Sequence, residues 1–195
     1  MEYIYEIENF MNATKCANII QRFEKSPHKK KGEMMLGLDE SFKKSIDLPI
    51  SREDMLVEWF DVIDTVTDDI LKALLVYIQY MASNNLDIES VIKRTILQSA
   101  IVAYPRIQRT DPGGFYKWHH DSYTNRMFTY IIYLNDVNEG CGGTTDFSCG
   151  KSILPKTGKL LLFPSSVTYL HCGQTLEKGV KYIMTGFIHM GKPIY

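Results

Sequence analysis

The sequence predicts an α+β chain, mostly β, in which N-terminal helices back a β-sandwich or barrel. Up to about residue 100, apolar residues recur at spacings of three and four, which is typical of amphipathic helices. From about Val102 they alternate with polar residues, which is typical of strands. No Pro-, Gly- or Ser-rich linker separates the two halves. We therefore expect one domain over residues 1–195, with a mainly helical support layer in 1–100 and the β core in 101–195.

Two helices are predicted in the first half. Asn12 is suited to cap the first, which ends near the basic run at residues 26–32. Its apolar face consists of Cys16, Ile19, Ile20 and Phe23. A capping-box pattern at residues 51–54 opens a longer helix, which we expect to end at residues 83–85. Its apolar residues, spaced by three and four, are Leu56, Trp59, Phe60, Ile63, Ile70, Leu74, Ile78 and Met81.

Strands are predicted where the apolar period shortens to two. The predicted strands are Tyr104–Thr110, Met127–Asn135, Lys159–Phe163 and Lys181–His189. Clusters of Gly and Pro at residues 111–114, 140–143 and 155–158 predict the turns between them. A further strand is expected to leave the turn at Gly113 and Gly114.

Composition excludes several classes of protein. With 22 Lys plus Arg against 23 Asp plus Glu, the chain lacks the positive field of a general binder of nucleic acids or anionic membranes. Acidic residues stand at the start, where a signal peptide has positive charge, and the most apolar window, residues 70–81, is too short for a membrane span. Four widely separated cysteines without a C-x-x-C pair predict free thiols. We therefore expect a cytoplasmic protein with no nucleic-acid or membrane partner; the oligomeric state is left open.

A candidate metal site begins at His119 and Asp121. Residues two apart on a strand point to the same side, so these two side chains converge while His120 points away. The best third ligand is His171, 50 residues after Asp121. Two histidines and one carboxylate suit non-haem Fe(II), because three coordination positions stay open, although Zn(II) is a rival. Trp118 and Tyr116 are predicted to share the face of His120, as packing residues.

A candidate anion site begins at Lys181, ten residues after His171. A lysine buried beside a metal needs an anion to offset the loss of its hydration. A dicarboxylate co-substrate would supply one. Thr129 and Tyr133 share a strand face, and their hydroxyls can donate to the same carboxylate.

Taken together, these motifs resemble the 2-oxoglutarate and Fe(II) dependent dioxygenases of the prolyl 4-hydroxylase type, including phage-encoded and microbial members. The resemblance covers about residues 103–188. The matching blocks are residues 107–121 (IQRTDPGGFYKWHHD), 129–135 (TYIIYLN), 142–147 (GGTTDF), 155–158 (PKTG), 162–165 (LFPS), and His171 with Lys181. The chain departs from the family at the tyrosine that members place nine or ten residues before the first histidine, where Thr110 and Arg109 stand.

The resemblance implies a double-stranded β-helix, or jelly roll, with the metal site in residues 101–195. It implies that His119, Asp121 and His171 bind Fe(II) and are the catalytic residues. Lys181 would pair with the far carboxylate of 2-oxoglutarate. Dioxygen is the second co-substrate, and ascorbate is a possible accessory.

The resemblance also implies hydroxylation of an unactivated C–H bond, with a prolyl residue in a peptide or protein as the favoured substrate. A free amino acid or small metabolite is the first alternative. A non-catalytic jelly-roll module that only binds metal is the second. Whether residues 28–45 form a substrate lid is left open.

Overall fold

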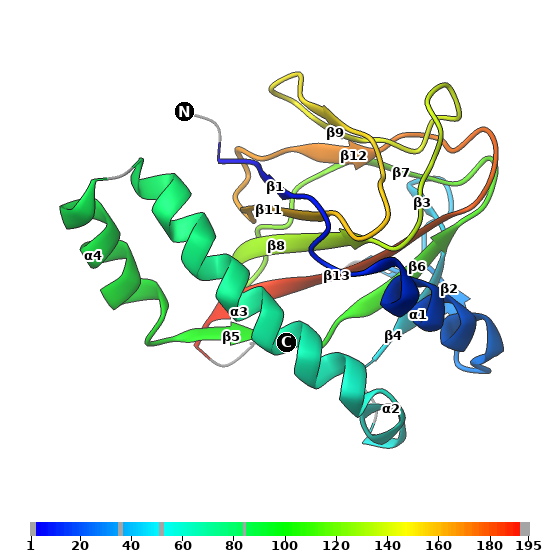
Figure 1. The fold of residues 1–195 in the computed structure, drawn as a ribbon. Helices are drawn as coiled ribbons and strands as arrows, with labels where there is room; N and C mark the ends of the chain where they lie inside the picture. Colours follow the sequence, from blue (N-terminus) through cyan, green and yellow to red (C-terminus); the bar gives the residue numbers. More distant parts are fainter. Residues whose placement is uncertain (1–2, 35–36, 51–52, 84, 192–195) are drawn as a thin grey trace.

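Two antiparallel β-sheets form the body of the molecule (Figure 1). The computed structural model describes residues 3–34, 37–50, 53–83 and 85–191. The larger sheet has the order β1 (Tyr5–Ile7), β11 (Leu160–Pro164), β8 (Arg126–Tyr133), β13 (Lys181–Met190), β6 (Arg106–Thr110), β4 (Ile46–Pro49) and β2 (Lys30–Lys31), with β5 (Ala100–Val102) also paired to β13. The smaller sheet has the order β10 (Ser152–Ile153), β9 (Thr145–Phe147), β12 (His171–Gly173), β7 (Phe115–His119) and β3 (Lys43–Lys44).

Strand β8 shows why the larger sheet is buried on both faces. Phe128, Tyr130 and Ile132 point from β8 into the core beneath the helices. Ile131 and Tyr133 point into a second core cluster, which contains Phe147 of β9 and therefore lies between the sheets. Alternation along a strand thus supplies two apolar layers.

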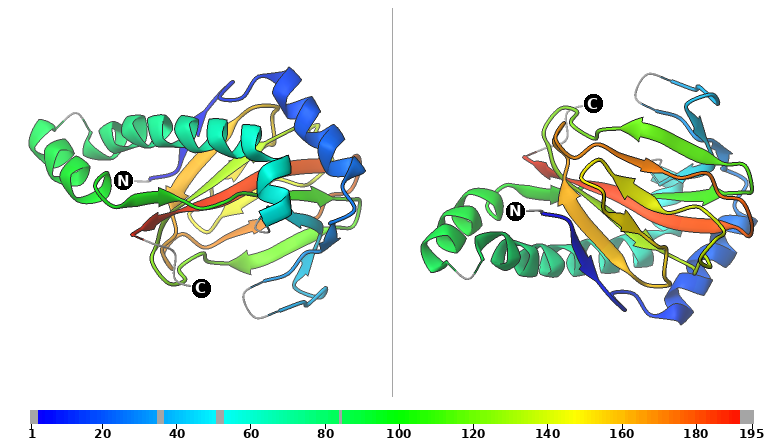
Figure 2. Two further views of the ribbon diagram at one scale, coloured as in Figure 1. Left: turned by 90° about the horizontal axis from the view of Figure 1, so that it is seen from below. Right: turned by 90° about the horizontal axis from the view of Figure 1, so that it is seen from above.

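Helices cover the outer face of the larger sheet (Figure 2). The covering helices are α1 (Ala13–Lys25), α2 (Glu53–Glu58) and α3 (Phe60–Ala82), and α4 (Leu86–Ile96) packs against α3 beside the sheet. Tyr77 of α3 packs edge-on against Phe128 of β8, with ring centroids 5.3 Å apart. The predicted jelly roll backed by N-terminal helices is confirmed.

The first helix has the predicted cap and apolar face. The Asn12 side chain accepts a hydrogen bond from the backbone N–H of Lys15 at 2.8 Å, and Cys16, Ile19 and Phe23 are buried. The four predicted strands correspond to β6, β8, β11 and β13. Most of the remaining strands have only two or three residues, too few for a period-two pattern to register.

The long helix predicted from Ser51 to Ser83 is wrong in one respect, since it is divided into α2 and α3 at Trp59. Trp59 is fully buried and leaves the helical conformation, with φ −103° and ψ 11°. The predicted capping box at residues 51–54 includes Ser51 and Arg52, which lie outside the described residues. The helix ends at Ser83 as predicted, but Asn85 then caps α4, which the sequence analysis did not predict.

No helix within the described ranges combines the length and apolar character that crossing a membrane requires.

Gly158, in the turn that precedes β11, fixes the N-terminal segment against the end of β8. Its N–H donates to the carbonyl of Tyr133 at 2.8 Å, and its own carbonyl accepts from Met11 N–H at 3.0 Å. Its φ of +76° favours glycine, and an added Cβ would overlap the backbone oxygen of Met11. This position therefore tolerates only hydrogen as a side chain.

We predict that Gly158→Ala lowers the free energy of unfolding by about 3 kcal/mol, because backbone strain and overlap add. Urea denaturation measures the loss. Gly150→Ala is the matched control: φ is +92° there, but no atom lies within 4 Å of the added Cβ. The control should lose only about 1 kcal/mol. Equal losses at both positions would contradict the role given to the Met11 contact.

Candidate metal centre and its pocket

Strand pairing brings His119, Asp121 and His171 together. His171 of β12 lies directly opposite His119 of β7 in the register of the smaller sheet. The three candidate ligand atoms lie within 4.8 Å of one another. His119 Nε2 is 4.0 Å from one carboxylate oxygen of Asp121, and His171 Nε2 is 3.5 Å from the other. All three predicted metal ligands therefore converge on one point in the structure.

Hydrogen bonds orient both imidazole rings for metal binding. The Nδ1 atom of His119 is 2.8 Å from the carbonyl oxygen of Lys117, and that of His171 is 3.0 Å from the carbonyl of Tyr169. A carbonyl can only accept, so Nδ1 holds the proton and Nε2 presents its lone pair. Burial, reinforced by the neighbouring His171, lowers the pKa of His119 and so favours the neutral ring that a metal needs.

Thr129 holds the carboxylate of the site. Its hydroxyl donates to Asp121 Oδ2 at 2.8 Å and lies 2.9 Å from the hydroxyl of Ser165. A carboxylate held in this way presents its oxygens in a fixed direction. The donor set of two neutral imidazoles and one carboxylate fits Fe(II) in a facial arrangement, and it also fits Zn(II).

A β-bulge changes which side chains join the site. Across the β7–β12 pair, His171 lies opposite His119 but Gly173 lies opposite Tyr116, so three steps on β7 match two on β12. Tyr116 therefore faces the same side as His119 and stacks on it, with ring centroids 3.6 Å apart. The prediction that Tyr116 shares the face of His120 is wrong. Bulges leave no pattern in a short sequence window, so strand periodicity alone could not reveal this one.

His120 is not one of the three clustered ligand residues, as predicted, although it lines the same pocket. Its ring stacks on Tyr123, with centroids 5.3 Å apart, and its Nδ1 accepts from the backbone N–H of Ser122. Trp118 is 49% exposed and lines the pocket, so it is not a packing residue. Cys172 also lines the pocket, and burial raises the pKa of its thiol.

A pocket of about 900 Å³ opens over the triad. The inner faces of β6 and β13 line it, together with β7, β12 and parts of the segment from residue 33 to residue 50. Lys181, the first residue of β13, is buried in this pocket, and its Nζ donates to the carbonyl of Gly143 at 2.8 Å. Burial lowers the pKa of Lys181 to about 8, opposed by the charges of Cys172 and Asp146. A buried ammonium with one carbonyl partner is suited to receive an anion.

Asn135 positions Lys181 through the backbone. Its side-chain amide donates to the carbonyl of Val180 at 2.7 Å and accepts from the N–H of Tyr182 at 2.7 Å. These two bonds bracket Lys181 on both sides. The sequence analysis did not assign Asn135 a role, although it ends one of the quoted blocks.

Tyr133 lies deeper than the pocket surface. It is fully buried, and its hydroxyl donates to Thr145 at 2.7 Å. Thr145 lines the pocket and Tyr133 does not. The structure therefore places Thr145 between Tyr133 and the space that a co-substrate would occupy.

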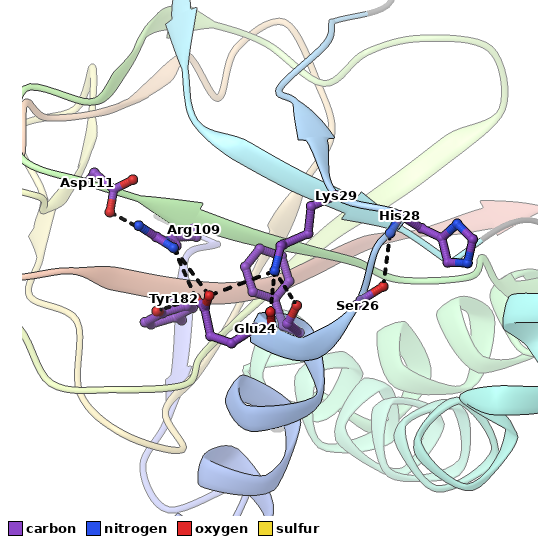
Figure 3. A network of polar contacts seen from close by, with 8 residues as sticks. Glu24, Ser26, His28, Lys29, Arg109, Asp111 and Tyr182 are labelled. Atoms are coloured by element: carbon purple, nitrogen blue, oxygen red, sulfur yellow. Dashed lines mark hydrogen bonds and ion pairs between the residues drawn. The ribbon is translucent and has the colours of Figure 1, made fainter.

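Arg109 and Thr110 point to opposite faces of β6. Arg109 joins an outer network, with Nε donating to Asp111 at 2.9 Å and Nη1 paired with Glu24 of α1 at 3.3 Å (Figure 3). Tyr182 also donates to Glu24, at 2.6 Å. Thr110 lines the pocket and pairs with Lys181 in the strand register. The network thus ties α1 to the outer face of the strand pair whose inner face holds Thr110 and Lys181.

Part of the second half of the chain is similar to a known family. Residues 105–189 match the model of the 2OG-Fe(II) oxygenase superfamily, in which "2OG" stands for 2-oxoglutarate. The family and the triad together imply Fe(II) and 2-oxoglutarate. No curated protein matches the chain.

Solved structures share the fold over nearly the whole chain. A viral collagen prolyl hydroxylase from Paramecium Bursaria Chlorella virus-1 has a TM-score of 0.66 at 20% identity, covering 98% of this chain and 97% of that one. A prolyl hydroxylase from Trichoplax adhaerens, in complex with a hypoxia inducible factor peptide fragment, has a TM-score of 0.69 at 17% identity, covering 97% and 84%. A Pseudomonas putida prolyl-4-hydroxylase has a TM-score of 0.68 at 16% identity, covering 97% and 94%.

We predict that alanine at His119, Asp121 or His171 weakens binding of Mn(II), an oxygen-stable substitute for Fe(II), by roughly 100-fold or more, since each removes one of three ligands. Equilibrium dialysis measures the affinity.

His120→Ala is the control for this experiment and should keep the Mn(II) affinity within about threefold, because its ring stacks on Tyr123. Loss of metal in His120→Ala together with retention in His119→Ala would show that the assignment of faces on β7 is wrong.

Proposed function

We propose that this chain, whose residues 105–189 match the 2OG-Fe(II) oxygenase superfamily, is itself such an oxygenase and hydroxylates an unactivated C–H bond of a prolyl residue in a peptide or protein. The observation that carries the proposal is the meeting of the triad and the buried Lys181 in one pocket. A metal triad alone would equally suit a structural site. A buried ammonium in the same pocket adds a place for an anionic co-substrate.

Bound Fe(II), with 2-oxoglutarate and dioxygen, supplies the oxidising power for hydroxylation, and the oxoacid is converted to succinate and carbon dioxide. His119, Asp121 and His171 would hold the metal. Lys181 would bind the far carboxylate, with Thr110 beside it in the strand register. Thr129 orients Asp121 through its hydroxyl.

Tyr133 acts in this proposal through Thr145. Because its hydroxyl donates to Thr145, the oxygen of Thr145 is fixed in position and its own proton is left for a ligand in the pocket. The predicted donation of both hydroxyls to one co-substrate carboxylate is therefore replaced by indirect roles, since Thr129 donates to Asp121 and Tyr133 donates to Thr145.

The prolyl substrate is supported by the neighbours and by the pocket. All three structural neighbours described above are named prolyl hydroxylases, and one was solved with a peptide fragment. Trp118, Tyr123 and Phe187 line the pocket, and aromatic faces suit contact with a pyrrolidine ring. The pocket is also large enough for a peptide segment beside the co-substrate.

Mass spectrometry tests the proposed reaction. The protein is incubated with Fe(II), 2-oxoglutarate, ascorbate and either proline-containing peptides or a cell lysate. We expect a gain of one oxygen atom in a prolyl residue, matched by succinate, and neither product from His171→Ala. Succinate formation driven only by free amino acids or small metabolites would replace the peptide assignment. No succinate under any condition would favour a module that only binds metal.

We predict that 2-oxoglutarate affinity weakens as pH rises through 8. Below about pH 8 the Lys181 ammonium is already protonated in the free protein, whereas above it binding must take up a proton. The dissociation constant should therefore rise roughly tenfold between pH 7 and pH 9. Calorimetric titration of the Mn(II)-loaded protein measures it.

Lys181→Met is the matched variant for this titration. It should bind 2-oxoglutarate about tenfold or more weakly at pH 7 and lose the pH dependence. A wild-type affinity that is constant from pH 7 to pH 9, or an equal slope in the variant, would remove Lys181 from the carboxylate site.

A further inference from the structure

A polar stripe runs along the pocket surface of β6. Arg106, Gln108 and Thr110 alternate along the strand and all line the pocket. In the register with β13, Thr110 pairs with Lys181 and Arg106 pairs with Thr185. Lys181 and Arg106 therefore lie toward opposite ends of the same strand pair.

The backbone positions at these two ends are farther apart than a short diacid is long. Thr110 and Arg106 are four residues apart on a strand, which corresponds to about 13 Å. A five-carbon diacid spans only about 6 Å at ordinary C–C bond lengths. If Lys181 binds 2-oxoglutarate, Arg106 remains available for a different molecule in the same pocket.

Asp47 of β4 cannot neutralise both Lys43 and Arg106. Its Oδ2 accepts from Lys43 Nζ at 2.7 Å, Arg106 Nη1 at 3.3 Å and Gln108 Nε2 at 3.4 Å. Its Oδ1 accepts from the hydroxyl of Ser45 at 2.8 Å. One carboxylate thus serves two cations, and the cluster keeps a net positive charge.

Lys43 and Arg106 differ in how much solvent they reach. The Lys43 side chain is 3% exposed and that of Asp47 is 1%, so this pair is a closed buried ion pair. The Arg106 side chain is 37% exposed, and only its Nη1 has acceptors among the described residues, namely Asp47 and the carbonyl of Glu33. The remaining guanidinium N–H groups are therefore available to a ligand.

Among the described residues, the other charged side chains that line the pocket form no ion pair with Arg106. The Glu33 carboxylate is paired with Lys30. Asp121 is committed to the triad and Thr129. A second guanidinium, that of Arg126, lines the same pocket and stacks on the Phe187 ring at 3.6 Å. Asp39 also lines the pocket, where its carboxylate accepts from the backbone N–H and the hydroxyl of Ser41, so the excess of positive charge is the local one at Lys43, Asp47 and Arg106.

We propose that Arg106, supported by the Lys43–Asp47 pair, is a carboxylate-binding subsite that selects substrates with an acidic group near the residue to be hydroxylated. This inference rests on the proposed function, because it assumes that Lys181 takes the co-substrate. The carboxylate comes from an aspartyl or glutamyl side chain of a peptide or from the main-chain carboxylate of a free amino acid.

Calorimetric binding to protein loaded with Mn(II) and 2-oxoglutarate tests the subsite without turnover. The probes are acetylated and amidated nine-residue peptides with a central proline and one Asp placed in turn at each of the other positions, each compared with its Asn counterpart. L-Proline compared with L-prolinamide tests the free amino acid. We expect at least one acidic probe to bind about tenfold more tightly than its neutral partner.

Arg106→Gln keeps a donor toward Asp47 and removes the charge. In this variant the acidic and neutral probes should bind within about twofold of each other. Arg94→Gln, at an exposed position on α4, is the matched control and should keep the full preference. The subsite is refuted if wild type prefers no acidic probe, or if Arg106→Gln keeps the preference.

Turnover assays of the same probes with the Fe(II)-loaded protein distinguish the two proposals. An acidic preference in binding without any oxygen added to proline would overturn the prolyl substrate and leave the carboxylate subsite intact. Hydroxylation of acidic and neutral peptides at equal rates, with equal affinities, would overturn the subsite and leave the prolyl function intact.

Discussion

The pairing of β12 with β7 is the constraint on which the site depends. It places His171 opposite His119, although 52 positions separate them in the chain. Asp121 follows β7 directly and is held by Thr129 of the opposite sheet. The triad is therefore fixed by both sheets, and the bulge in the same pair turns Tyr116 onto the ring of His119. A change in this register would move metal ligands and pocket wall together.

The two buried lysines of the pocket, Lys43 and Lys181, differ in how their charges are compensated. Lys43 is compensated inside the protein by Asp47, at a distance of 2.7 Å. Within the described part of the chain, Lys181 has the Gly143 carbonyl as its one hydrogen-bond partner, and burial lowers its pKa. The first arrangement is stable without a ligand, because the charge has a partner. The second leaves a cost of desolvation that an anion relieves, so it is the arrangement expected of a binding residue.

Local patterns in the sequence were sufficient for the long elements and for the spacing of the triad. Asn12, the face of α1 and strands β6, β8, β11 and β13 all follow from period and capping. Tyr116 could not be placed, because a bulge is set by how two strands pair rather than by either strand alone. The helix break at Trp59 likewise depends on tertiary burial. Arg106, by contrast, shares a period-two face with Thr110 and was within reach of sequence reasoning.

The residues on the two faces of β6 have different surroundings, and this difference connects the helical layer with the pocket. Its outer residues, Ile107 and Arg109, contact the helical layer through the core and the Glu24 network. Its inner residues, Arg106, Gln108 and Thr110, face the pocket. Anchoring of the outer face fixes the strand, and the strand in turn fixes the separation between Lys181 and Arg106. The helical layer therefore holds in place the strand on which Arg106 and Thr110 stand four residues apart, and with it the separation of the two proposed subsites.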